Sequence, residues 1–373
     1  MQQALLAAQS SLYITSPNPR VGCVIVHNHT QRIIATGATQ AAGGPHAERV
    51  ALDQARAAGY TCLKNTTIYV TLEPCSHYGR TPPCVQALIA AQPHTVVVAL
   101  IDPNPKVAGQ GVAALQAAGI AVVVGVEAEA ALALNIGFVA RMRRQRPWLW
   151  LKTASSLDGR TALDNGESKW ITGAEARADG QHFRARSCLV LTGIGTVIDD
   201  NPLLNVRTLA TSRQPIRAVV DSQLRICPQA AIFNGDPVWV FSTRTCPELA
   251  HELAKRQGKI IVLPATAQGQ VDLSALMQYL ATQQINEVHT EAGATLNGAL
   301  WQAGLVDALV SYIAPCVIGP GRPIMHVAPL SQLNQSQHFD LYDQRQVGTD
   351  IRLLMRHPLH WQQLLHTLDQ MPT

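Results

Sequence analysis

The feature that most constrains the fold is a regular alternation of short apolar runs with helical segments, which extends through most of the 373 residues. In the first part of the chain, helical patterns occupy residues 46–59, 84–92 and 111–119. Between them lie runs rich in β-branched residues, at 21–26, 32–37, 67–72, 95–100 and 120–125. This alternation predicts an α/β/α sandwich with a largely parallel sheet.

A second domain is expected beyond Pro147. The helical pattern from about Glu127 to Arg144 must end there, because a proline disfavours helix in the residue before it. We therefore predict domains of residues 1–146 and 147–373, since one core rarely grows to this chain length. Apolar runs resume at 148–154, 187–193, 216–221, 237–242, 259–264, 286–291 and 309–314. Helical segments between several of them predict a second α/β domain.

Composition excludes several classes of protein. Hydrophobic residues make up 47% of the chain and charged residues 14%, which is incompatible with a disordered chain. The net charge of +4 is dispersed, which favours small anionic ligands over nucleic acid. No apolar run reaches the roughly 18 residues of a membrane span, and no signal peptide is evident. We expect a cytoplasmic protein without membrane or nucleic-acid partners, and leave open whether it forms a homo-oligomer.

A catalytic zinc site is predicted from three residues. His46 lies in Gly-Pro-His-Ala-Glu at the start of a helical pattern, and Cys75 and Cys84 bound the segment CSHYGRTPPC. Three nitrogen or sulfur ligands with one open position are what a catalytic zinc requires. Cys84 opens the next helical pattern, where free amides stabilise a thiolate. The eight cysteines are too sparse for a disulfide scaffold.

Glu48 is predicted to act on protons rather than to bind the metal. It follows His46 by two positions, and residues at that offset do not share a helix face. A carboxylate beside the metal can perform the acid/base work of a nucleobase deaminase. The alternatives are a capping or core histidine and two merely buried cysteines. His77 is a competing ligand, although its loop position suits substrate contact better.

The longer motifs resemble one family over nearly the whole chain. They are SPNPRVGCVIV (16–26), PHAE (45–48), PCSHYGRTPPC (74–84), DPNPKVAGQG (102–111), LKTASSLDGRTA (151–162), GESKWIT (166–172), DDNPLLNVR (199–207) and EAGATLNGAL (291–300). The chain resembles the bifunctional riboflavin-biosynthesis enzymes, in which diaminohydroxyphosphoribosylaminopyrimidine deaminase is joined to 5-amino-6-(5-phosphoribosylamino)uracil reductase. Other nucleobase deaminases have a compact P-C-x-x-C instead of the long cysteine segment.

The resemblance implies a fold and two activities. It implies a cytidine-deaminase-like α/β/α sandwich followed by a dihydrofolate-reductase-like α/β domain. His46, Cys75 and Cys84 would bind zinc and Glu48 would be the proton shuttle. The first domain would deaminate 2,5-diamino-6-(5-phosphoribosylamino)pyrimidin-4-one, and the second would use NADPH to reduce the ribosyl group of 5-amino-6-(5-phosphoribosylamino)uracil to ribityl.

The second half contains no G-x-G-x-x-G fingerprint, and Gly193-Ile-Gly195 is only a weak substitute. The turn from Glu291 to Gly298 is a better phosphate site, because it leads into a helix start, although it could be a plain turn. The resemblance assigns NADPH contacts to Ala154, Trp170, Thr196, Asp200, Ser222, Gly293, Ala294, Thr295, Leu296, Asn297, Gly298 and Ala299. It assigns substrate contacts to Ser168, Arg184, Leu204, Arg207 and Glu291, of which the two arginines suit the substrate phosphate.

A separate hypothesis concerns the 2′-phosphate of NADPH. Ser242, Thr243 and Arg244 directly follow an apolar run, and we expect them to bind this phosphate. Two other functions are weighed against the bifunctional enzyme. One is an RNA-editing zinc deaminase with a C-terminal RNA-binding domain, and the other is a zinc-stapled scaffold, which would need a fourth protein ligand.

Overall fold

The computed structural model describes residues 1–77, 82–105 and 107–368. The chain divides into two compact units, one formed by Met1–Arg144 and the other by Gln145–Trp361. This division falls next to the predicted boundary after residue 146, but the residues from Gln362 on group with the first unit. Among the described residues, no helix combines the length and apolar character needed to cross a membrane.

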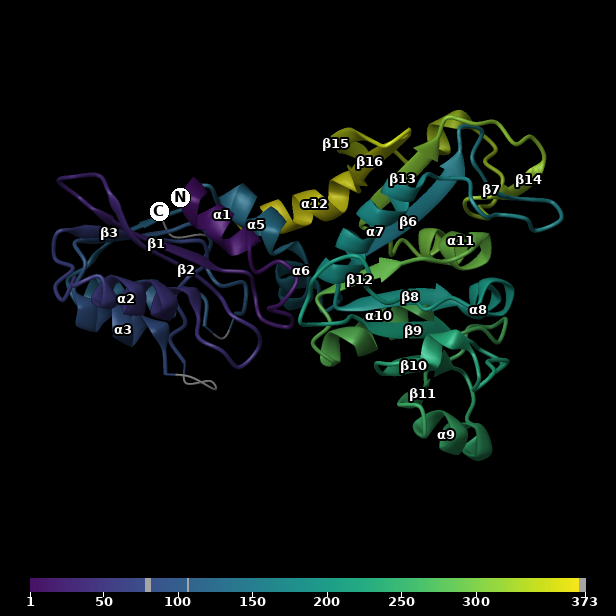
Figure 1. The fold of residues 1–373 in the computed structure, drawn as a ribbon, viewed down its shortest axis with the longest axis horizontal. Helices are drawn as coiled ribbons and strands as arrows, with labels where there is room; N and C mark the ends of the chain where they lie inside the picture. Colours follow the sequence, from purple (N-terminus) through teal and green to yellow (C-terminus); the bar gives the residue numbers. More distant parts are fainter. Residues whose placement is uncertain (78–81, 106, 369–373) are drawn as a thin grey trace. The chain divides into compact units, whose positions relative to one another are not determined.

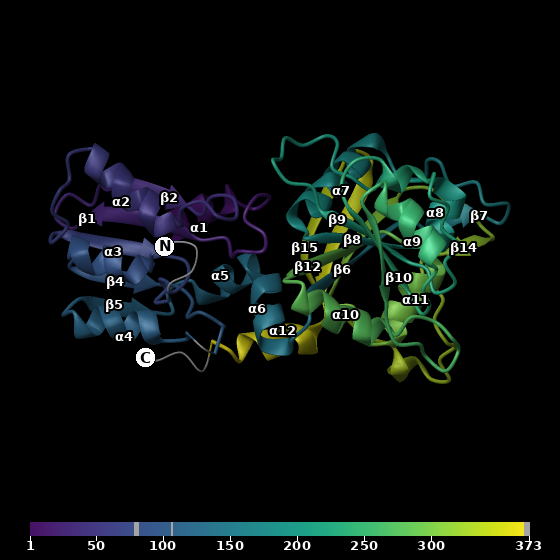
Figure 2. The same ribbon diagram turned by 90° about the horizontal axis from the view of Figure 1, so that it is seen from below.

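The first unit contains a five-stranded sheet in the order β2-β1-β3-β4-β5, which can be followed in Figure 2. The strands are β1 (Gly22–His27), β2 (Ile33–Ala38), β3 (Thr66–Val70), β4 (Thr95–Val98) and β5 (Ala121–Val124). β3, β4 and β5 are parallel, whereas β1 is antiparallel to both of its neighbours. The prediction of a largely parallel sheet is therefore wrong for β1, which runs against the other four strands. The connection at 28–32 is too short for a parallel crossover between β1 and β2.

Helices cover both faces of this sheet. The helices of this unit are α1 (Gln2–Gln9), α2 (Ala47–Ala57), α3 (Cys84–Ala91), α4 (Gln110–Ala117), α5 (Ala128–Leu134) and α6 (Ile136–Arg144). A Cβ on Gly22 would lie 1.8 Å from the carbonyl oxygen of Ala4 in α1, and one on Gly37 would lie 2.1 Å from that of Ala47 in α2. Gly37 pairs with Cys23, the neighbour of Gly22, so the two glycines face opposite sides of the sheet. Figure 1 shows α3 beside α2. The predicted α/β/α sandwich is confirmed.

The predicted helix at 127–144 is interrupted at Asn135, where α5 ends and α6 begins. The buried Asn135 side chain accepts a hydrogen bond from the backbone N–H of Arg20 at 2.7 Å and donates one to the carbonyl of Arg20 at 2.9 Å. Asparagine side chains compete with helical backbone hydrogen bonds in this way, but the sequence alone does not identify the partner.

The second unit is built on a nine-stranded sheet in the order β11-β10-β9-β8-β12-β6-β13-β16-β15 (Figure 1). Its parallel strands are β6 (Trp148–Ser156), β8 (Leu189–Gly193), β9 (Ile216–Val220), β10 (Val238–Ser242), β11 (Gly258–Val262), β12 (Glu287–Thr290) and β13 (Ala308–Ala314). Every apolar run predicted in this half forms one of them, which confirms the second α/β domain.

Two antiparallel strands at the edge of this sheet are absent from the prediction. They are β15 (Asp340–Val347) and β16 (Asp350–Arg356). Most side chains of β15 are exposed, so it has no apolar pattern to recognise. A separate small sheet pairs β7 (Arg160–Leu163) with β14 (Gly321–Pro323).

The helices of the second unit are α7 (Ala174–Arg186), α8 (Ile194–Asp200), α9 (Pro247–Ala254), α10 (Leu273–Thr282) and α11 (Ala294–Gln302), with short 3-10 turns at Ala231–Phe233 and Leu333–Gln335. A further helix, α12 (Pro358–Leu365), begins in this unit and continues past Trp361. On one side of the sheet Leu189 and Leu191 belong to the same core cluster as Leu276 of α10. The neighbouring Val190 belongs to a second cluster with Val197 of α8. The central strands are thus buried on both faces, as parallel strands usually are.

The strand order places several turns along one edge of this sheet. The chain runs outward from β8 through β9 and β10 to β11, and then returns to insert β12 between β8 and β6. The carboxyl ends of all these strands lie at the same edge because they are parallel. Ligands of open α/β sheets bind at this edge, near the point where the strand order reverses.

Candidate active sites

The first unit brings three metal-binding side chains together. The donor atoms of His46, Cys75 and Cys84 all lie within 4.8 Å of one another. Nδ1 of His46 is 3.6 Å from Sγ of Cys75 and 3.3 Å from Sγ of Cys84. One imidazole nitrogen and two sulfurs fit zinc, and three protein ligands leave one coordination position for a reactant. This is the only group of this kind among the described residues, and His77 is not part of it.

Local structure explains why these side chains converge. His46 is the N-cap of α2, Cys75 follows β3 by a few residues, and Cys84 is the first residue of α3. The backbone N–H of Cys84 donates to Sγ of Cys75 at 3.3 Å. Hydrogen bonds from the Cys84 thiol and from this backbone N–H lower the pKa of Cys75 to about 4. The low pKa favours the thiolate that a metal requires. Part of the predicted substrate loop between the two cysteines, residues 78–81, lies outside the described residues.

Glu48 lies beside these groups in the first turn of α2, and only 3% of its surface is exposed. Its burial, with the nearby Cys75 charge, raises its pKa to about 7, although its own backbone amide, His46 and the Cys84 thiol act in the opposite direction. The buried Cys23 of β1 also lies near enough to feel the Glu48 charge. A carboxyl group in this position can both accept and return a proton.

Glu73, which the sequence analysis did not single out, fixes a loop next to Cys75. Its buried carboxylate accepts four backbone hydrogen bonds of 2.7–3.1 Å, from the N–H groups of Asp102, Gly109, Gly111 and Val112. The last two belong to the first turn of α4, whose N-cap Gly109 has no side chain to supply this acceptor. Burial and the charge of Glu73 raise the pKa of Asp102 to about 6, and the charge of His77 opposes this shift.

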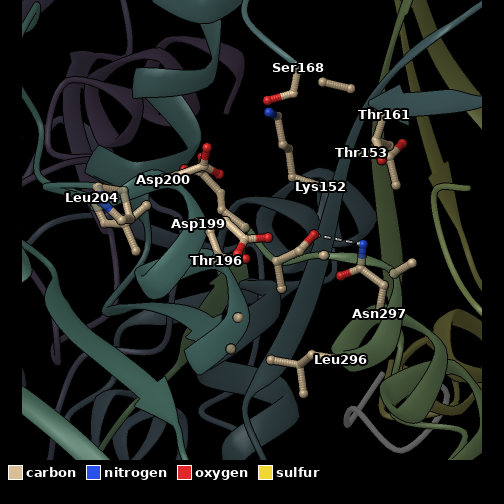
Figure 3. A pocket seen from close by; sticks show the side chains of 18 of the residues that line it. Lys152, Thr153, Thr161, Ser168, Thr196, Asp199, Asp200, Leu204, Leu296 and Asn297 are labelled. Atoms are coloured by element: carbon tan, nitrogen blue, oxygen red, sulfur yellow. Dashed lines mark hydrogen bonds between the residues drawn. The ribbon is translucent and has the colours of Figure 1, made fainter. Parts of the chain in front are cut away.

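The second unit contains a large cleft at the carboxyl edge of its sheet (Figure 3). Its volume is about 1840 Å³, above the roughly 300–1,000 Å³ of a single small-ligand site, so a dinucleotide and a second ligand can be held together. Seven Lys or Arg residues line it, against four Asp or Glu residues, which suits anionic ligands. A Cβ on Gly195 would meet no atom within 4 Å, so the turn after β8 leaves open space at the backbone.

Nearly all residues that the sequence assigned to NADPH or substrate line this cleft. They are Ala154, Ser168, Trp170, Arg184, Thr196, Asp200, Leu204, Arg207, Ser222, Glu291, Gly293, Ala294, Thr295, Leu296, Asn297 and Ala299. Trp170 is 68% exposed, with the guanidinium of Arg177 4.3 Å from its ring centre. Its indole therefore belongs to the cleft surface and not to the core.

Two groups of residues that the sequence analysis assigned to NADPH lie outside the cleft lining. Gly298 does not line the cleft; a Cβ there would lie 1.9 Å from the carbonyl oxygen of His326, so close packing of α11 explains this glycine. Ser242, Thr243 and Arg244 do not line it either. The hydroxyl groups of Ser242 and Thr243 both donate to the carbonyl of Ser222, because β10 is one strand further from the cleft centre than the predicted set.

Lys152 is the main cleft residue that sequence reasoning missed. It is on β6, within a segment that the sequence analysis identified as a strand and as part of the motif at 151–162, but without a role for the lysine. Figure 3 shows its side chain reaching into the cleft. Burial lowers its pKa; the Glu291 charge opposes this effect and the Arg184 charge adds to it. Lys152 lies in the middle of β6, next to Leu151, which pairs with Thr290 at the end of β12, directly before Glu291.

Both halves of the chain match known families. Residues 1–100 match the cytidine and deoxycytidylate deaminase zinc-binding region, and residues 147–353 match the RibD C-terminal domain. Riboflavin biosynthesis protein RibD of Escherichia coli is 45% identical, with 95% of this chain and 97% of that protein covered. The Haemophilus influenzae protein of the same name is 43% identical, with 95% of each covered.

Solved structures agree over the same length. Acinetobacter baumannii RibD superposes with a TM-score of 0.86 at 44% identity, covering 95% of this chain and 97% of that one. A diaminohydroxyphosphoribosylaminopyrimidine deaminase/5-amino-6-(5-phosphoribosylamino)uracil reductase from Thermotoga maritima gives a TM-score of 0.84 at 31% identity, with 96% and 97% covered. The two sites described above therefore lie in a chain that belongs to the riboflavin biosynthesis protein RibD family.

Proposed function

We propose that this chain catalyses two successive reactions on a small phosphoribosylated pyrimidine. The first unit hydrolytically deaminates 2,5-diamino-6-(5-phosphoribosylamino)pyrimidin-4-one. The second reduces the ribosyl group of the resulting 5-amino-6-(5-phosphoribosylamino)uracil to ribityl with NADPH. We assign deamination to residues 1–146 and reduction to residues 147–361. The observation that supports this most directly is the convergence of His46, Cys75 and Cys84 beside the buried Glu48.

Deamination replaces an exocyclic amine by oxygen from water and releases ammonia. The zinc that His46, Cys75 and Cys84 would hold supplies a Lewis acid that acidifies water. The Glu48 carboxylate would take one proton from the attacking water and deliver it to the ring nitrogen. It would then move the second proton of that water to the leaving amine, which departs as ammonia. Burial of Glu48 excludes bulk water from this exchange.

Reduction needs an oriented cofactor and a proton. NADPH supplies the hydride, which goes to the C1′ carbon of the opened ribosyl group, and one proton must reach the atom that was doubly bonded to it. Lys152 is the best placed proton donor, because it is a half-buried ammonium group inside the cleft. Arg184 is paired with the Glu291 carboxylate. The guanidinium of Arg207 donates from Nη1 to Asn205 Oδ1 at 3.0 Å and has no carboxylate partner among the described residues. Arg207 is therefore better suited to bind the substrate phosphate.

The alternatives considered from sequence have less support. An RNA-editing deaminase would need an RNA-binding C-terminal domain, whereas residues 147–353 match the RibD C-terminal domain. A structural zinc scaffold would need a fourth protein ligand, and the described part of the chain places only three donors together.

The test follows the two signals separately in one protein. Purified full-length protein is given the diaminopyrimidine ribotide without NADPH, and ammonia release is measured. NADPH is then added and its oxidation is followed. We expect ammonia first and NADPH oxidation only afterwards. NADPH oxidation that does not depend on prior deamination, or no ammonia release by zinc-loaded protein, would contradict the proposal.

A further inference from the structure

Arg225 differs from the other arginines of the cleft because its guanidinium has no partner among the residues that the structure describes. Lys169 is 3.6 Å from Asp200, Arg322 is 3.0 Å from Asp199, and Arg184 is paired with Glu291. Arg177 lies over the Trp170 ring, and Arg207 donates to Asn205. Arg225 lines the same cleft and is exposed, and it forms no hydrogen bond or ion pair with any residue that the structure describes.

The segment that holds Arg225 is firmly anchored. It follows β9, where the carboxylate of the fully buried Asp221 accepts a hydrogen bond from the backbone N–H of Ile226 at 2.8 Å. The hydroxyl of Ser222 donates to Gln270 and accepts from the backbone N–H of Val271 at 3.0 Å. Asp221, Ser222 and Ile226 are thus fixed, and Arg225 is presented on a tight turn toward the cleft.

The sheet order indicates which part of a dinucleotide lies near Arg225. Lys152 lies on β6, and Glu291 directly follows the neighbouring strand β12. These two residues mark the reacting end of the cleft. The open glycine turns after β8 and β12 lie in the middle. β9 is two strands from β12, or roughly 10 Å at about 4.8 Å per strand. With the nicotinamide at the reacting end, the adenosine ribose extends toward β9.

We propose that Arg225 binds the 2′-phosphate on the adenosine ribose of NADPH and so makes this reductase prefer NADPH to NADH. The planar guanidinium can donate two parallel hydrogen bonds to one phosphate. This inference rests on the proposed reductase function. It replaces the expectation for Arg244, which follows β10 and lies outside the cleft lining.

The test measures binding without turnover. Dissociation constants for NADPH and NADH are obtained from the fluorescence of the reduced nicotinamide with full-length protein. Arg225→Ala should weaken NADPH binding about tenfold or more and leave NADH binding unchanged. Arg225→Lys should give an intermediate loss, because it keeps the charge but not the fork of donors. The matched control is Arg244→Ala, which should change neither constant.

The possible outcomes distinguish a failure of this inference from a failure of the proposed reductase function. Equal weakening of both nucleotides by Arg225→Ala, no weakening of either, or a selective loss of NADPH in Arg244→Ala would overturn the assignment of Arg225. If the wild-type protein binds neither nucleotide, the reductase proposal fails and this inference fails with it. Arg225 is exposed, so the variant should fold, and unchanged NADH binding, which takes place in the same unit, verifies this.

Discussion

The guanidinium of Arg184 and the carboxylate of Glu291 form a two-point ion pair inside the cleft, although they lie 107 positions apart in the sequence. Nη2 of Arg184 donates to Oε2 of Glu291 at 2.8 Å, Nε donates to Oε1, and Nη1 donates to the carbonyl of Asn205 at 2.9 Å. Burial alone would raise the pKa of Glu291, but Arg184 and a hydrogen bond from His289 hold it well below its usual value.

This pairing predicts strong coupling between the two residues. Arg184→Ala leaves a buried carboxylate without its cation and should lower the free energy of unfolding by about 3–5 kcal/mol. The double variant Arg184→Ala/Glu291→Ala should cost clearly less than the sum of the single changes. Urea unfolding followed by tryptophan fluorescence measures this in the second unit alone, which contains Trp148, Trp150, Trp170, Trp239, Trp301 and Trp361. Additive effects would contradict the coupling.

Glu48→Gln should abolish deamination without disturbing the second reaction. The amide is nearly the same size as the carboxyl but cannot accept and return a proton, so ammonia release should fall by about 10²- to 10⁴-fold. Zinc content and NADPH oxidation with the deaminated substrate should match those of the wild type. A variant that loses its zinc together with its activity would instead assign Glu48 a structural role.

How far the sequence predicts the sites depends on the kind of signal. His46, Cys75 and Cys84 could be predicted because metal ligands need particular residue types at limited spacings. The loop-fixing role of Glu73 could not, because its four donors are backbone N–H groups that any residue supplies. The choice between Arg225 and Arg244 depends on which turn borders the cleft, and only the positions of β9 and β10 determine that.

The fold shows the same division. Apolar runs identified the buried strands, but they contain no information on the return of β12 to a place between β8 and β6. This return brings Glu291 next to Lys152, which directly follows the four apolar residues that begin β6. β15 lies at the edge of the sheet and pairs only with β16. Most of its side chains are exposed, so its sequence has no hydrophobic pattern.

The reductase should lose activity as pH rises through the pKa of Lys152. The protonated ammonium is the proposed donor, so activity is present below this pKa and lost above it. Because burial lowers the pKa, the loss should begin below the value of about 10.4 for a free lysine. Lys152→Met should remove this limb of the pH profile of kcat and lower kcat at neutral pH by about 10²- to 10⁴-fold. Persistence of the limb in the variant would exclude Lys152 as the titrating group.

Gly298 should tolerate no side chain, for a reason of packing. In Gly298→Ala the new Cβ would lie 1.9 Å from the His326 carbonyl, and the backbone on both sides must move. We expect a loss of about 1–3 kcal/mol in the free energy of unfolding. Gly180→Ala, within α7 and with no atom inside 4 Å of the new Cβ, is the matched control and should be neutral or stabilising. Tryptophan fluorescence measures both, and equal behaviour of the two variants would contradict the packing explanation.

Glu73→Gln should loosen the loop at 102–112 and slow deamination without removing the metal. Each oxygen of the carboxylate accepts two hydrogen bonds from backbone N–H groups. In the glutamine variant the NH₂ group would replace one of these oxygens, and as a donor it could accept neither of the two N–H groups there. Hydrogen exchange at the amides of Gly109 and Gly111 should therefore accelerate. Since the same carboxylate fixes the loop next to Cys75, the KM for the pyrimidine should rise while zinc content stays unchanged. The exposed Glu129→Gln is the control for loss of a carboxylate in this unit. Faster exchange with an unaltered KM would restrict Glu73 to stabilising α4.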